Sequence, residues 1–107
     1  MARKCNHKWT RQSRKLAILT VLNNYQIMDI DDVYNKAAHI VNDMYSNEDN
    51  PPTTGFSVKC GFKSAILHFT GNSDSSFANV PDDYMSIMRE VLYERGISES
   101  KFVALFS

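Results

Sequence analysis

Two stretches near the start of the chain carry apolar residues at the three- and four-residue steps of an amphipathic helix. In residues 10–25, Thr10 suits the N-cap because its hydroxyl can accept a hydrogen bond from an N–H group of the first turn. In residues 30–45 the stripe is clearer, and Asp29 or Asp31 suits its start. The pattern predicts two helices. Their apolar faces are expected to consist of Ala17, Ile18, Val21, Leu22 and Tyr25 in the first, and of Ile30, Tyr34, Ala37, Val41 and Met44 in the second.

Beyond Pro51 and Pro52, which cannot continue a helix, the hydrophobic period changes to two. Apolar and polar residues alternate over residues 56–62, and the alternation resumes over residues 65–69 after a break near Gly61. This pattern predicts a β-hairpin with its turn at residues 61–64. Cys60 is then expected to be a small core residue, and His68 an edge or surface residue of the second strand.

Residues 80–95 return to helical spacing, with Pro81 at a first helical position and Gly96 as a helix-ending residue. The polar residues 70–79 before them are expected to form a flexible loop. Residues 98–106 fit either a short helix or a final strand. The predicted fold is a small α+β domain of order α-α-β-β-α with a short C-terminal helix or strand, whose helices pack on a minimal antiparallel hairpin.

Length and composition favour one globular domain spanning residues 1–107. The chain has 107 residues, of which 43% are hydrophobic and 22% charged, and this is typical of a folded protein. No apolar run is long enough to cross a bilayer, and the early residues lack the apolar core of a signal peptide. With only two cysteines, the chain is expected to be a cytoplasmic protein with no membrane partner.

Charge is unevenly distributed along the chain. Residues 1–28 hold six of the twelve basic residues and no acid, whereas residues 29–107 hold the other six against all twelve acids. Residues 1–9 are expected to form a flexible basic arm. Two interpretations stay open: the arm contacts an anionic partner, or it neutralises the acidic remainder of its own chain.

The first functional hypothesis is a non-enzymatic intracellular protein that binds nucleic acid or a nucleoprotein complex. Basic side chains neutralise phosphates, and an indole ring can stack on a base. The predicted contact residues are Arg3, Lys4, Lys8, Trp9, Arg11, Arg14 and Lys15.

Two short segments resemble parts of DNA-binding proteins. The segment TRQSRKLAILTVLNNYQIMDIDDVYNKA, from Thr10, resembles the opening of winged-helix regulators, in which a basic helix is followed by a short strand and an Asp-rich helix start. The segment VLYERGISESKFVALF, from Val91, is similar to a helix–turn–helix with Gly96 at the turn and Phe102 and Leu105 in the core. The would-be reading helix of this second segment offers Glu99 and Lys101 but no Arg, Asn or Gln for base edges. Both also fit ordinary packed helix pairs.

The alternative hypothesis is a small inhibitor or adaptor that binds only protein, of the kind found among accessory proteins of mobile elements. An acidic surface with tyrosines would dock on a basic protein partner. The residues predicted for this surface are Asp31, Asp32, Tyr34, Asp43, Tyr45, Glu48 and Asp49.

Catalytic and metal-binding patterns are weak. Cys5, His7, Cys60 and His68 have the right types for zinc but not the usual ligand spacing. Cys60 could pair with His39 or His68 as a nucleophile, although nothing local marks an activated thiol. Asp29, Asp31 and Asp32 are better explained by helix capping than by a cation site. We therefore expect no enzyme activity, no metal, no cofactor and no small-molecule substrate.

Overall fold

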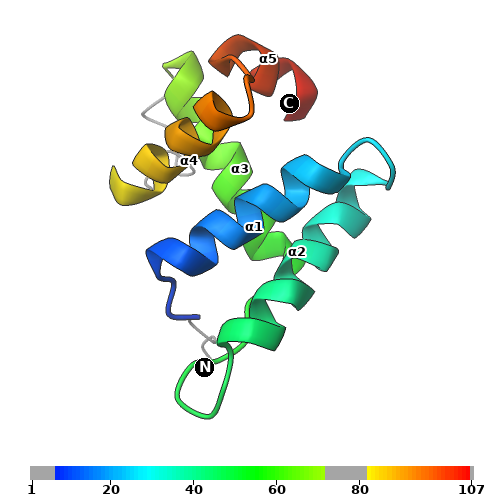
Figure 1. Ribbon diagram of the computed structural model, residues 1–107, viewed down its shortest axis with the longest axis vertical. Helices are drawn as coiled ribbons and strands as arrows, with labels where there is room; N and C mark the ends of the chain where they lie inside the picture. The colour runs from blue at the N-terminus through cyan, green and yellow to red at the C-terminus, as the bar shows by residue number, and fades with distance from the viewer. Residues whose placement is uncertain (1–6, 72–81, 107) are drawn as a thin grey trace. The chain divides into compact units, whose positions relative to one another are not determined.

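Helices are the only extended secondary structure in residues 7–71 and 82–106, which are the residues that this computed structural model describes. Helices hold 74% of them, and the only β-type pairing there is an isolated bridge between Asn47 and Asn50. The chain divides into two compact units, Met1–Val58 and Lys59–Ser107. The single domain expected from the length stays a prediction. The helices are α1 (Arg11–Asn24), α2 (Ile30–Tyr45), α3 (Gly55–Thr70), α4 (Asp82–Glu94) and α5 (Glu99–Phe106) (Figure 1).

The first predicted helix and its cap are confirmed. Thr10 has an extended backbone, its Oγ1 accepts a hydrogen bond from the Ser13 N–H at 3.1 Å, and its own N–H donates to Ser13 Oγ at 2.8 Å. This reciprocal capping box satisfies two backbone donors at the start of α1. Tyr25, just beyond the helix, is half-buried. The buried residues of α1 are Ser13, Ala17, Ile18, Thr20, Val21 and Leu22.

The second predicted helix is also confirmed, but the predicted burial of Met44 is wrong. α2 packs beside α1 after a short turn, so the two helices run antiparallel (Figure 1). Met44 is 64% exposed because it lies in the last turn of α2, beyond Val41, the last residue that the helix buries. Ile30, at the other end of the stripe, is 42% exposed. The residues that α2 buries are Val33, Tyr34, Ala37, Ala38 and Val41.

Residues 56–69 form a helix, so the predicted β-hairpin and the α+β class are wrong. Val58, Phe62 and Ala65 are buried at steps of four and three, which is the spacing of one helical face. Thr54 caps the helix, because its Oγ1 accepts a hydrogen bond from the Ser57 N–H at 3.2 Å. The helix α3 is followed by Gly71, whose φ of 81° suits glycine. Cys60 and His68 therefore lie on a helix and not on strands.

An aromatic cluster joins α3 and α5 in the second unit. The ring centroid of Phe62 lies 5.5 Å from that of Phe102 and 5.1 Å from that of Phe106. Phe69 meets the Phe102 ring edge-on at 5.6 Å. These separations suit attractive aromatic pairs, which add to the stabilisation from apolar burial.

The predicted end of the third amphipathic helix is confirmed in α4. Gly96 has a φ of 68°, its N–H donates to the Tyr93 carbonyl at 3.1 Å, and the Ile97 N–H donates to the Leu92 carbonyl at 2.9 Å. This bonding is a Schellman motif, which requires a left-handed residue after the helix. Residues 99–106 then form a helix, α5, and not a strand. The predicted loop at residues 72–79 and Pro81 lie outside the described residues.

Candidate nucleic-acid interface

Four cationic residues gather at the N-terminal end of α1, and we call them the basic end: Lys8, Arg11, Arg14 and Lys15. Lys8 and Arg11 are exposed, whereas Arg14 and Lys15 are half-buried. The three helical members are spaced i, i+3 and i+4, so they share one face, and the first turn of α1 contains no acid. Each of the three also interacts with another group of the chain. Arg3 and Lys4, the other predicted basic contacts, lie outside the described residues.

The fold gives these cations a structural role as well. Positive charges at a helix N-terminus oppose the helix dipole, but the antiparallel α2 brings its negative C-terminal end beside them. The Asn50 amide group donates to the carbonyl of Tyr45, the last residue of α2, at 2.9 Å and to the Lys8 carbonyl at 3.4 Å. α2 has no basic residue in its own last turn, and these hydrogen bonds hold the backbone of Lys8 close to that end.

Residues 7–9 are held against the loop that follows α2. The Lys8 N–H donates to Asn50 Oδ1 at 2.6 Å, and His7 Nδ1 donates to the Pro51 carbonyl at 2.8 Å. The imidazole of His7 also meets the indole of Trp9 edge-on, with 4.7 Å between ring centroids. Trp9 is half-buried, so part of its ring remains accessible. The described part of the predicted arm is therefore tied down, and flexibility of residues 1–6 stays a prediction.

The residues predicted as an acidic docking surface do not come together. Tyr34 is only 3% exposed and belongs to the core, and burial together with the nearby Asp31 carboxylate raises its pKa to about 12. Asp31 and Asp32 lie at the start of α2, whereas Asp43 lies near its end, and a helix of this length spans roughly 24 Å. Tyr45 is half-buried, and Glu48 and Asp49 are exposed on the loop that holds Lys8.

A second surface, which the sequence patterns did not single out, lies at the turn between α1 and α2. We call it the apolar–acidic turn, and its residues are Ile27, Met28, Asp29, Ile30, Asp31 and Asp32. Ile27 is 77% exposed and all three carboxylates are exposed. Asp29 is the N-cap residue of α2, but its side chain makes no capping hydrogen bond. The available signal was an apolar pair, Ile27 and Met28, within a polar helix break.

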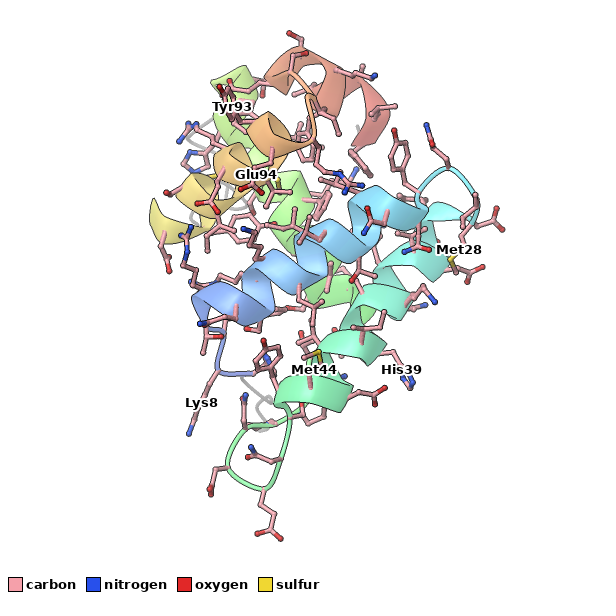
Figure 2. The ribbon with its side chains drawn as sticks, in the orientation of Figure 1. Lys8, Met28, His39, Met44, Tyr93 and Glu94 are labelled. Carbon is pink, nitrogen blue, oxygen red and sulfur yellow. The ribbon has the colours of Figure 1, made fainter. Side chains whose placement is uncertain are left out.

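The two surfaces lie at opposite ends of the α1–α2 pair. Lys8 marks one end and Met28 the other (Figure 2). The basic end can attract anions, and the apolar–acidic turn can attract cations that accompany an apolar surface. The first unit is thus polarised along its helices.

Metal-binding and nucleophilic chemistry has little support in residues 7–71 and 82–106. There, no group of three His, Cys, Asp or Glu side chains could hold a metal ion, and Cys5 lies outside these ranges. Burial raises the pKa of the Cys60 thiol, and the nearby Lys59 lowers it by less. A raised pKa keeps a thiol protonated at neutral pH and therefore weakly nucleophilic.

The helix pair α4 and α5 has two of the three features expected from its resemblance to DNA readers. Gly96 makes the turn and Phe102 is fully buried. Leu105, expected in the core, is partly exposed, and Glu99 is engaged by Arg89, whose Nε lies 3.6 Å from the Glu99 carboxylate. The winged-helix resemblance fails at its strand, because residues 25–29 between α1 and α2 form a turn and not a strand.

Comparisons with family models, curated proteins and solved structures find no match to the chain. Among the described helices, none is both long and apolar enough to cross a membrane.

Proposed function

We propose that the protein binds nucleic acid, without catalysing a reaction on it, through the basic end of α1. The observation that carries this proposal is the gathering of four cations around a single helix N-terminus with no acid in its first turn. Lys8 and Arg11 are exposed and can reach phosphates from either side of that turn. Such contacts neutralise the backbone charge and release counterions, so they favour binding without regard to base sequence.

Local structure adds two further attractions for a phosphate chain. The N–H groups of the first turn and the positive end of the α1 dipole strengthen the local field for anions. Trp9, held beside His7, leaves part of its indole accessible for stacking on an unpaired base. Single strands and duplexes are therefore both candidate ligands.

The second unit supplies an independent feature of DNA-binding proteins. α4 and α5 are joined through a glycine turn, and α5 presents Ser100 and Lys101 to solvent. Lys101 can donate to guanine, but α5 has no Arg, Asn or Gln beside it, so we expect contacts from α5 to be made mainly to phosphates. This agrees with sequence-independent binding.

The experiment measures fluorescence anisotropy of labelled nucleic acids over a salt series. The probes are a random-sequence duplex and a single strand of about 20 nucleotides each. The test variant replaces Arg11, Arg14 and Lys15 by Gln. The matched control replaces Lys36, Lys59 and Lys63 by Gln, which removes the same charge at residues outside the proposed contacts. Circular dichroism verifies that both variants remain helical.

We expect the wild type to bind both probes with a strong salt dependence. The test variant should flatten the slope of log affinity against log salt by roughly 0.7–0.9 for each phosphate that the protein no longer neutralises, and the control should flatten it much less. Replacing Glu48 and Asp49 by their amides should tighten binding, because two carboxylates near Lys8 are removed. The proposal is rejected if the wild type shows no salt-dependent binding, or if test and control variants weaken it equally.

A further inference from the structure

Three of the four residues from Ile27 to Ile30 are apolar, although they lie where the turn after α1 meets the first residue of α2. Turns at the surface normally use polar residues, Gly or Pro, each for a backbone reason. A single exposed apolar residue needs no explanation, and Phe56, 71% exposed, is such a case. The apolar–acidic turn is different, because Ile27, Met28 and Ile30 lie within four residues, with Ile27 77% and Ile30 42% exposed.

Hydrogen bonds tie both ends of this turn to the adjoining helices. The Tyr25 N–H donates to the Val21 carbonyl at 3.0 Å and the Ile27 N–H donates to the Asn24 carbonyl at 3.1 Å. On the other side, the Val33 N–H donates to the Asp29 carbonyl at 3.0 Å. The isoleucines are thus presented on a pre-ordered backbone, which reduces the entropy lost when a partner binds them.

From these features we propose that the apolar–acidic turn docks a segment of another protein that combines an apolar face with lysine and arginine side chains. The isoleucines provide apolar contact. Asp29, Asp31 and Asp32 provide a negative rim, and the Asp29 carboxylate is free of the capping bond that would otherwise occupy it. A partner with cations around an apolar centre is complementary in both properties.

Charge excludes two other occupants from this proposal. An anionic membrane surface would be repelled by three carboxylates at the point of insertion. A nucleic acid would be repelled for the same reason, so this surface is separate from the basic end, which lies at the other end of the α1–α2 pair (Figure 2). The inference therefore goes beyond the proposed nucleic-acid function and does not depend on it.

The probe is a synthetic amphipathic helical peptide of about 18 residues with leucines on one face and lysines on the other. Two companion peptides carry glutamates in place of the lysines, or serines in place of the leucines. Each is titrated into uniformly ¹⁵N-labelled full-length protein, and amide shifts identify the contact residues. The variants are Ile27→Ser with Ile30→Ser, and Asp29→Asn with Asp31→Asn and Asp32→Asn. Their matched controls are Phe56→Ser, and Glu48→Gln with Asp49→Asn.

We expect the leucine–lysine peptide to shift amides of residues 25–33, and the two companion peptides to shift them weakly or not at all. The double isoleucine variant should weaken binding of the leucine–lysine peptide at least about fivefold, and Phe56→Ser should not. The triple aspartate variant should weaken binding and reduce its salt dependence, whereas the control at residues 48 and 49 should not.

Several results would overturn the proposal. The largest amide shifts could lie outside residues 25–33, or the test and control variants could weaken peptide binding equally. The glutamate or serine peptide could also bind as tightly as the leucine–lysine peptide. Concentration-dependent self-association in sedimentation, abolished in the double isoleucine variant, would assign the turn to a second copy of the chain and reject a foreign partner. The nucleic-acid titration uses other residues and another readout, so failure of one proposal leaves the other standing.

Discussion

Gly55, the first residue of α3, lies directly against Asn35 in the middle of α2. A Cβ atom on residue 55 would stand 2.9 Å from Asn35 Cγ and 3.0 Å from the Asn35 backbone nitrogen. The side chain of Asn35 can rotate away, but its backbone nitrogen is fixed in the helix. The start of α3 therefore approaches α2 so closely that a Cβ atom at residue 55 would require the Asn35 side chain to move and the two backbones to shift slightly.

Replacing Gly55 by Ala should destabilise the protein by about 1–3 kcal/mol, because the backbones must separate. Ordinary helix propensity predicts the opposite sign, since Ala stabilises a helical position relative to Gly. Urea unfolding monitored by circular dichroism measures the free energy of unfolding and decides between the two expectations. The exposed Ser57→Ala is the control. A stabilised Gly55→Ala variant would show that the close approach relaxes freely.

Replacing Val41 by Asp should unfold the protein or lower its stability by more than about 4 kcal/mol. Val41 is fully buried, and an unpaired carboxylate in that position has no compensating partner. Met44→Asp, less than one turn further along α2 but mostly exposed, should change stability by less than about 0.5 kcal/mol. Equal thermal stability of the two variants would contradict the assigned faces of α2.

Alkaline pH should destabilise the fold through Tyr34. The folded-state pKa of its phenol, about 12, lies above the ordinary value of 10.0, so folding favours the protonated form. The resulting stabilisation is fully present below about pH 10 and is lost as the pH rises through 12, with a total of roughly 2–3 kcal/mol. Urea unfolding of the wild type and of Tyr34→Phe between pH 9 and 12 measures this decrease.

The two proteins differ only at residue 34, so the difference between their stability curves is the informative quantity. Tyr34→Phe should lose stability less steeply with rising pH than the wild type. Parallel curves for the two proteins would mean that the phenol ionises as readily in the folded state as in the unfolded chain.

Replacing Asn50 by Ala should loosen the segment around Trp9. The variant lacks the hydrogen bonds of the Asn50 side chain to the Lys8 N–H and carbonyl and to the Tyr45 carbonyl. Trp9 is the only tryptophan in the chain, so its emission reports on this segment alone. We expect a red-shifted maximum and lower anisotropy, with Glu48→Ala unchanged. An unaltered spectrum would indicate that His7 and Pro51 are sufficient to hold the segment.

Local signals with a direct chemical cause were predictable from the sequence. The Thr10 cap, the break after residue 24, the interior of α2 and the Gly96 turn each follow from hydrogen bonding or backbone conformation within a few residues. These interactions form in the same way whatever lies further along the chain, which is why sequence pattern suffices for them.

The error at α3 arose because one run of residues fits two periods. Phe56, Val58, Cys60 and Phe62 alternate like a strand, but Val58, Phe62 and Ala65 also form one helical face. The exposed Phe56 shows which period the fold uses. A hairpin needed a turn dipeptide at residues 61–64, and Thr54 and Gly71 were available as helix boundaries.

The candidate surfaces were predictable only in part. Charge is visible in the sequence, so the basic residues of α1 were found. An amphipathic residue such as Tyr34 fits both the apolar face of α2 and a docking surface, and its burial confirms the first expectation and removes it from the second. Ile27 and Met28 were overlooked, since their exposure depends on α1 and α2 turning at that point.

The boundary between the two units falls between Val58 and Lys59, inside α3, where a continuous helix replaces the usual linker. A chain cut at this boundary would break the i to i−4 hydrogen bonds on both sides of the cut. The downstream fragment would keep a few turns of α3, whereas the upstream fragment would keep only one. A segment of one turn is too short to persist as a helix by itself. The two halves of this protein are consequently not interchangeable modules, and an insertion or fusion is better placed at an exposed site such as residues 48–49.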